Sequence, residues 1–133
     1  LLNYDNNARD GDTWMVAEVD ESDRSHLNLN PRHVVVNNLE VDHLNFYEGL
    51  EDIIDTMARF VNENDALETL ALNWDDAGVR QLAEKINRPY LKYGTEGELD
   101  FAARDLVDHG DKVSFVAWRG DAVIVEAIAG DVA

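Results

Sequence analysis

The sequence contains no cysteine, which excludes disulfides, thiolate metal sites and a thiol nucleophile. It also has no run of about 20 apolar residues of the kind that spans a bilayer. Residues 1–12 are polar and acidic, so they do not resemble a secretory signal. These absences favour a cytoplasmic protein with no membrane partner.

Basic residues are scarce as well. Eleven lysines and arginines oppose 28 acidic residues, the formal net charge is −17, and only Lys85, Lys92 and Lys112 are lysines. A surface this negative repels nucleic-acid phosphates and anionic lipids, so neither is expected as a partner. Abundant acid with little lysine is typical of proteins that stay soluble at high salt, which favours a halophilic source. The alternative is an ordinary acidic protein.

Two glycine-rich nucleotide motifs are missing. The sequence contains neither G-x-x-x-x-G-K-[ST] nor G-x-G-x-x-G. Without the first motif, the chain has no backbone cradle for nucleotide phosphates and no lysine to reach them. The segment alone is therefore not expected to grip a nucleotide tightly.

The distribution of apolar residues predicts a single α/β domain. Short apolar runs alternate with helical stretches, which indicates βαβ units around a mostly parallel sheet. Helices are predicted at 48–61, where apolar residues recur every third or fourth position, and at 76–86, which Pro89 prevents from continuing. The predicted strands of this part are 14–17, 34–36, 67–72 and 89–93.

The last third of the chain shows a different pattern. Apolar runs at 99–106, 112–118 and 122–128 have no helix between them. The turn dipeptides Gly110–Asp111 and Gly120–Asp121 separate these runs and predict two hairpins. We therefore expect a small C-terminal antiparallel sheet attached to the parallel one.

A cluster of carboxylates follows the first apolar run. Glu18, Asp20, Glu21 and Asp23 fall within six residues of each other. In open α/β sheets, ligands bind beyond the carboxyl ends of the strands, and carboxylate oxygens suit Mg²⁺. A solvated loop in an already acidic protein is the alternative interpretation.

A second polar segment, residues 37–43, follows the run 34–36 and ends in Asp42 and His43. An imidazole beside a carboxylate can bind a metal ion while the acid orients the ring. If the two strands are parallel neighbours, Glu18 and His43 lie together at one edge of the sheet. The remaining histidines, His26, His33 and His109, are expected at the surface.

These two segments carry a family resemblance. Residues 17–27 read A-E-V-D-E-S-D-R-S-H-L, and residues 37–47 read N-N-L-E-V-D-H-L-N-F-Y. They resemble A-E-A-D-E-S-D-x-S-F-L and T-N-I-x-x-D-H-L-x-x-Y of the Mur ligases, in the same order and at the same spacing. Residues 75–80 and 88–94 resemble further stretches of that family, so the resemblance covers nearly the whole chain.

The resemblance implies that residues 1–133 are part of the central, ATP-binding domain of a Mur ligase, without its phosphate loop and its N- and C-terminal domains. It implies that Glu18 and His43 hold a Mg²⁺ between the ATP γ-phosphate and the substrate carboxylate. Asn38 would lie beside the nucleotide, and Asn73 would approach its adenosine end. The implied reaction of peptidoglycan synthesis activates UDP-N-acetylmuramate as an acyl phosphate, which the amine of L-alanine then attacks.

Some positions depart from the family pattern. Asn37 stands where alanine-adding members usually have Thr, as in the related ligase that reattaches a recycled murein tripeptide. That relative usually has D-E-Y-D where Ser22 stands here, so alanine addition is favoured. His26 replaces a usual Phe, and the chain ends before the family's G-x-H-N segment.

Because the phosphate loop is missing, the segment alone is expected to be inactive and to hold neither ATP nor Mg²⁺. Two other function classes stay open. One is a non-catalytic binding module derived from a ligase. The other is a metal-dependent hydrolase that uses Glu18, Asp20, Asp42 and His43.

Overall fold

The computed structural model describes residues 2–4, 8–10, 13–19, 24–40 and 48–130. Its main feature is a six-stranded sheet in which the strands follow one another in chain order. The strands are β4 (His33–Val36), β5 (Thr69–Asn73), β6 (Leu91–Gly94), β7 (Phe101–Asp108), β8 (Lys112–Arg119) and β9 (Ala122–Gly130). The pairs from β4 to β7 are parallel, and β7, β8 and β9 are antiparallel. The predicted fold class, including the C-terminal antiparallel sheet, is confirmed.

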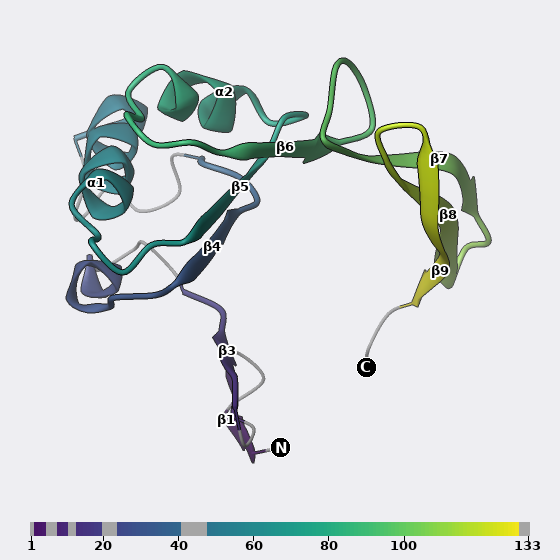
Figure 1. Cartoon of the computed structure of the whole chain (residues 1–133), viewed down its shortest axis with the longest axis horizontal. Coiled ribbons are helices and arrows are strands. Elements are labelled where there is room, and N and C mark those ends of the chain that lie inside the picture. The colour runs from purple at the N-terminus through teal and green to yellow at the C-terminus, as the bar shows by residue number, and fades with distance from the viewer. Residues whose placement is uncertain (1, 5–7, 11–12, 20–23, 41–47, 131–133) are drawn as a thin grey trace.

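Two helices cover one face of the parallel strands (Figure 1). They are α1 (Leu50–Asn62) and α2 (Ala77–Ala83), and the short 3-10 helix η1 (Ser25–Asn28) precedes β4. Asp76 caps α2, since its Oδ1 accepts a 2.7 Å hydrogen bond from the backbone N–H of Val79. The α2 helix ends at Ala83, three residues earlier than predicted, because the next N–H groups bond three residues back as in a turn.

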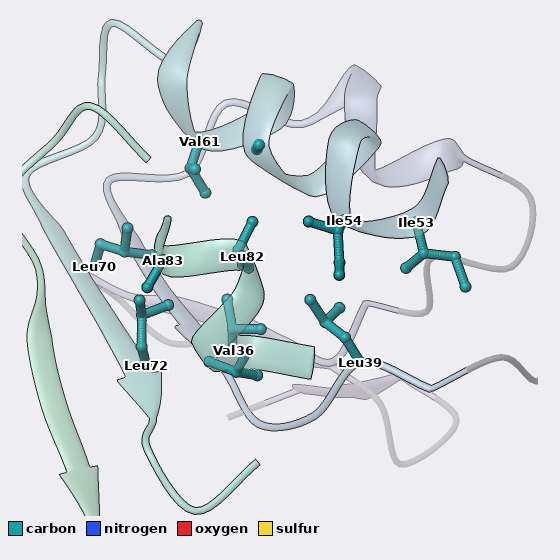
Figure 2. Packing of buried hydrophobic residues seen from close by; sticks show 11 residues of the cluster. Val36, Leu39, Ile53, Ile54, Val61, Leu70, Leu72, Leu82 and Ala83 are labelled. Atoms are coloured by element: carbon teal, nitrogen blue, oxygen red, sulfur yellow. The ribbon is translucent and has the colours of Figure 1, made fainter. Parts of the chain in front are cut away.

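The described hydrophobic core lies between these helices and the sheet (Figure 2). In β5 the residues alternate, so that Leu70 and Leu72 point to the helices, while Ile54 and Val61 come from the striped face of α1. The buried apolar residues are Val36, Leu39, Ile53, Ile54, Ala58, Val61, Leu70, Leu72, Val79, Leu82 and Ala83. None of them comes from β7, β8 or β9.

The β7–β9 sheet forms an arm at the opposite end of the molecule from α1 (Figure 1). Its two turns fall where the glycine–aspartate pairs predicted them. Several large apolar side chains of the arm are exposed, among them Leu106, Val123 and Ile128. The helices of the described structure therefore bury one half of the large sheet and leave the other half uncovered.

The expected pairing of the first strand was wrong. The structure places β3 (Met15–Ala17) in a separate antiparallel sheet with β1 (Leu2–Tyr4) and β2 (Ala8–Asp10), and pairs it with β2 instead of β4. The polar segment that contains β1 and β2 gave no strand signal, but it offers β3 an antiparallel partner through a short connection. Glu18 therefore follows a strand that does not belong to the parallel sheet.

Candidate functional site

Polar side chains gather at the carboxyl ends of β4, β5 and β6. The parallel register pairs Val36 with Leu72 and Asn73 with Tyr93, so the residues that follow the three strands share one edge of the sheet. This edge is the usual ligand position in open α/β sheets. Asn38 lies there as an exposed side chain, beyond the end of β4.

Asn73 links the ends of two strands. Its Nδ2 donates a 2.8 Å hydrogen bond to the backbone oxygen of Asn37, and its Oδ1 accepts one of 3.1 Å from the backbone N–H of Asp75. These two bonds fix which end of the amide carries nitrogen and which carries oxygen. They use one of the two amide hydrogens and one of the two lone pairs of the amide oxygen.

Tyr93 joins the end of β6 to the end of β4. Its hydroxyl lies 2.6 Å from Oδ1 of Asn37 and 3.2 Å from the backbone oxygen of Val36, and it can donate to either. Burial raises the pKa of the Tyr93 hydroxyl above its ordinary value, and the nearby charge of Asp75 raises it further. The hydroxyl therefore stays protonated and acts as a donor at neutral pH.

Asp75 holds the segment that leaves β6. Its carboxylate accepts hydrogen bonds from the backbone N–H of Thr95 at 2.8 and 3.0 Å, from the Thr95 hydroxyl at 3.0 Å, and from the N–H of Glu96 at 3.4 Å. The next residue, Asp76, reaches the other way and accepts a 3.4 Å bond from the N–H of Leu39. The two adjacent aspartates thus tie the end of β5 to the segments that follow β6 and β4.

The predicted metal pair is only half described. Glu18 lies directly after β3 with an exposed side chain, whereas His43 lies outside the described residues, as do Asp20, Glu21, Asp23 and Asp42. Within the described ranges, no three His, Asp or Glu side chains lie close enough together to hold a metal ion. The exposed carboxylate oxygens of Glu18 are of the hard-oxygen type that suits Mg²⁺.

The histidines that were expected at the surface behave differently from one another. His33 and His109 are exposed, and Nε2 of His109 lies 2.9 Å from Oγ of Ser114. The prediction was wrong for His26, which is 2% exposed and whose ring makes a T-shaped contact with the Phe60 ring, with the two ring centroids 5.2 Å apart. An imidazole is flat and apolar on its faces, so it packs against α1 where the family pattern has Phe.

An open groove of about 520 Å³ lies between α2 and the start of β6. The Trp74 and Tyr90 rings stack along it at 6.2 Å, and Nζ of Lys92 lies 4.2 Å from the Trp74 ring centroid. Of the predicted site residues that the structure describes, Glu18, Asn38 and Asn73, none lines this groove. The polar edge is therefore the better candidate for the predicted function.

Sequence reasoning missed the bonded network at this edge. It noted Asp75 and the Tyr93–Gly94 pair as parts of family-like stretches, but assigned them no role. The available signal was the polar character of every segment that follows a parallel strand. The partners themselves lie about 20 residues apart, so no local pattern could pair them.

Comparison with known proteins places this arrangement in a class of α/β ligase domains. Residues 2–130 match the family model of the Mur ligase middle domain. The chain therefore belongs to the Mur ligase family.

Curated relatives agree with this assignment. The UDP-N-acetylmuramate–L-alanine ligase of Geobacter sp. (strain M21) is 39% identical over 112 residues, which are 84% of this chain and 24% of the relative. The ligase of the same name from Hydrogenobaculum sp. (strain Y04AAS1) is 36% identical over 107 residues, or 80% of this chain and 24% of the relative. The chain thus spans about a quarter of the length of these relatives.

Two solved structures share the fold. The crystal structure of MurF from Acinetobacter baumannii matches with a TM-score of 0.62 at 16% identity, covering 84% of this chain and 24% of that one. A UDP-N-acetylmuramoyl-L-alanyl-D-glutamate–2,6-diaminopimelate ligase matches with a TM-score of 0.58 at 22% identity, over 72% of this chain and 20% of that one. Separately, no helix among the described residues is long and apolar enough to cross a membrane.

Proposed function

We propose that the chain is part of the middle domain of a cytoplasmic, ATP-dependent ligase that joins L-alanine to UDP-N-acetylmuramate. The observation that carries this proposal is the 39% identity to a ligase of that name over 84% of the chain. The polar edge formed by Asn37, Asn38 and Asn73 supports it, because it offers amide groups where α/β sheets bind ligands.

The proposed roles are those that the resemblance to the Mur ligases implies. Glu18 and His43 would hold Mg²⁺, which when bound neutralises charge on the transferring phosphoryl group. Asn38 and Asn73 would orient the nucleotide with their amides. The substrate carboxylate attacks the γ-phosphorus of ATP and ADP leaves; the alanine amine then attacks the acyl carbon, phosphate leaves and the amine loses a proton. Together these four side chains would hold ATP and the substrate carboxylate, which are both anionic, close enough to react.

The test uses the full-length protein that contains this segment. Phosphate release should require both UDP-N-acetylmuramate and L-alanine, and Glu18→Gln should lower its kcat roughly 100-fold. Glu40→Gln is the matched control, because Glu40 is also an exposed glutamate that follows a strand but has no role in the proposed reaction. If the full-length protein releases no phosphate with these substrates, the proposal is wrong.

One alternative acceptor is favoured by a specific residue. Asn37 replaces the usual Thr, as in the ligase that reattaches murein tripeptide, and its Oδ1 lies 2.6 Å from the Tyr93 hydroxyl. The same assay with the tripeptide in place of L-alanine decides between the two. A higher kcat/KM for the tripeptide would assign the recycling reaction.

The isolated chain should behave differently from the full-length protein. We expect negligible ATPase activity and at best millimolar affinity for ATP, because the sequence has no phosphate loop. Calorimetry with Mg²⁺, Mn²⁺ and Zn²⁺ tests the hydrolase alternative, which requires tight metal binding without nucleotide. Tight binding of ATP would contradict the expectation that the segment needs a phosphate loop to hold the nucleotide, and it would favour a free-standing binding module.

A further inference from the structure

Residues 95–100 connect the polar edge to the β7–β9 arm, and an aspartate anchors each end of this connection. At its start, the Asp75 carboxylate accepts hydrogen bonds from Thr95 and Glu96. At its end, Oδ2 of Asp100 accepts a 2.8 Å bond from the N–H of Lys92, and the Asp100 backbone oxygen accepts one of 3.3 Å from Gly120. Both carboxylates accept backbone N–H bonds, but the Asp75 carboxylate accepts more of them, and the Asp75 backbone also bonds to the polar edge.

The contact between Asp75 and the edge runs through its own backbone. Its N–H donates to Oδ1 of Asn73, so a shift of Asp75 moves the group that orients the Asn73 amide. The backbone of Trp74, between them, donates a 2.7 Å bond to the oxygen of Tyr93. A change in the position of the Asp75 side chain should therefore reach the Asn73 amide through the backbone of residues 73–75.

A second path reaches the edge from β6. The Asp75 carboxylate holds residues 95 and 96, which directly follow Tyr93 and Gly94. The Tyr93 hydroxyl in turn reaches Asn37, whose backbone oxygen accepts the bond from Asn73. Both paths end on the same pair of asparagines.

We propose that Asp75 is a positioning residue for the polar edge. By holding residues 95–96 against the end of β5, Asp75 orients Asn73 and Asn37. This inference rests on the proposed function, in which the amide of Asn73 faces ATP and Asn37 holds that amide through its backbone oxygen. Asp75 itself uses its carboxylate on protein donors, so its role is to fix the geometry of the amides. Restricting the amides before binding lowers the ordering cost of binding the nucleotide.

The test compares Asp75→Asn with Asp100→Asn in the full-length protein. Asp75→Asn replaces one carboxylate oxygen with an NH₂ group, which cannot accept hydrogen bonds from the N–H groups that now face that oxygen. The hydrogen bonds that hold residues 95–96 should therefore weaken. We expect the KM for ATP to rise roughly tenfold, with a smaller change in kcat and no change in the KM for L-alanine. Asp100→Asn removes the carboxylate at the other end of the same connection, which bonds to the N–H of Lys92 and not to the polar edge, and should leave the KM for ATP unchanged. Equal effects of both variants would overturn the proposal.

A milder pair of variants keeps the test decisive if Asp75→Asn does not fold. Thr95→Val removes the 3.0 Å hydroxyl bond to Asp75 and keeps the shape of the side chain, whereas Thr95→Ser keeps the hydroxyl. For Thr95→Val we expect the KM for ATP to rise about threefold, which is the size of effect expected from losing one exposed hydrogen bond. For Thr95→Ser we expect a KM for ATP close to that of the wild type. An unchanged KM in Thr95→Val would contradict the proposal.

A structural readout separates this proposal from the proposed function. In the 133-residue chain, the side-chain NH₂ resonances of Asn73 should shift in Asp75→Asn and stay in place in Asp100→Asn. If the wild-type full-length protein shows no ligase activity but these resonances shift, the proposed function fails and the positioning network stands. If the Asn73 resonances do not move, the positioning role is wrong whatever the enzyme does.

Discussion

The carboxylate of Asp75 occupies the space into which a side chain at Gly94 would extend. A Cβ placed on Gly94 would lie 2.6 Å from Oδ1 and 2.9 Å from Cγ of Asp75, closer than non-bonded atoms approach. Glycine at the end of β6 therefore lets the carboxylate reach the N–H groups of the next two residues. The packing of the polar edge therefore requires glycine at position 94.

The first prediction concerns Gly94→Ala. The new methyl group should displace the Asp75 carboxylate from its donors at Thr95 and Glu96. Losing charge-assisted hydrogen bonds of this kind should lower the free energy of unfolding by about 2 kcal/mol. Urea unfolding of the 133-residue chain, followed by circular dichroism, measures this change.

The control for this prediction is Gly49→Ala. Gly49 has a similar backbone angle, φ of 154° against 159° at Gly94, but a Cβ placed there meets no atom of the described residues within 4 Å. The substitution therefore reports the backbone cost alone. If both variants lose the same stability, the clash with Asp75 contributes nothing and the explanation fails.

The second prediction concerns the two halves of the large sheet. Leu72 of β5 is fully buried under the helices, whereas Leu106 of β7 is 52% exposed. Leu72→Ala should cost about 2–5 kcal/mol, because it removes buried methyl groups and leaves a cavity. Leu106→Ala should change stability by less than about 0.5 kcal/mol. Urea midpoints of the two variants test this, and a large effect at Leu106 would show that the arm is covered in solution.

The helical half of the fold could be predicted because its signals are local. Ile54 and Val61 belong to an apolar stripe with helical spacing, and Leu70 and Leu72 alternate as strand residues do. The parallel register then follows from the alternation of helices and strands. The two hairpins were visible from Gly110 and Gly120 for the same reason.

The pairing of β3 and the burial of His26 could not be predicted, since each depends on residues far away in the sequence or on a partner without a strand signal. The strand partner of β3 is β2, whose composition is polar, and His26 is buried by its contact with Phe60 of α1. A polar side chain gives no sign of burial until its neighbours are known.

The candidate site also has a part that could be predicted from the sequence and a part that could not. Glu18 was first singled out from the carboxylate cluster that follows an apolar run, whereas Asn38 and Asn73 were reached through the family resemblance. The hydrogen bonds of Asn73 now show how its amide is oriented. His43 stays a prediction. The hydrogen-bond partners of Asp75 could not be predicted from the sequence, because they follow a different strand.

The third prediction concerns pH. Burial, followed by the charge of Asp75, raises the pKa of Tyr93 above its ordinary value of 10.0. A raised pKa in the folded state means that deprotonation opposes folding. The stability that the protonated hydroxyl contributes is therefore fully present below about pH 10, and this contribution is lost as the pH rises through the folded-state pKa. The free energy of unfolding should fall in alkaline solution.

Tyr93→Phe isolates this contribution. At neutral pH it should cost about 1 kcal/mol for the lost hydrogen bond to Asn37. It should also show a shallower decline in stability above about pH 10 than the wild type. The pKa of Lys85 is raised too, chiefly by its hydrogen bond with Asp55, but Lys85 is present in both proteins and its effect cancels in the comparison. Identical slopes in the two proteins would contradict the assignment to Tyr93.

The last prediction concerns salt. With 28 acidic residues against 11 basic ones, the folded chain repels itself. Ion pairs such as Arg32–Glu68, with 65% and 51% of the side chains accessible, are exposed, so screening them costs little. Raising NaCl from about 0.1 M to 1 M shortens the screening length from roughly 10 to 3 Å, and should stabilise the fold by on the order of 1 kcal/mol. Urea midpoints at the two salt concentrations measure this. KCl serves as the control, since screening predicts the same gain for both salts, and a loss of stability in either salt would exclude self-repulsion as the dominant electrostatic effect.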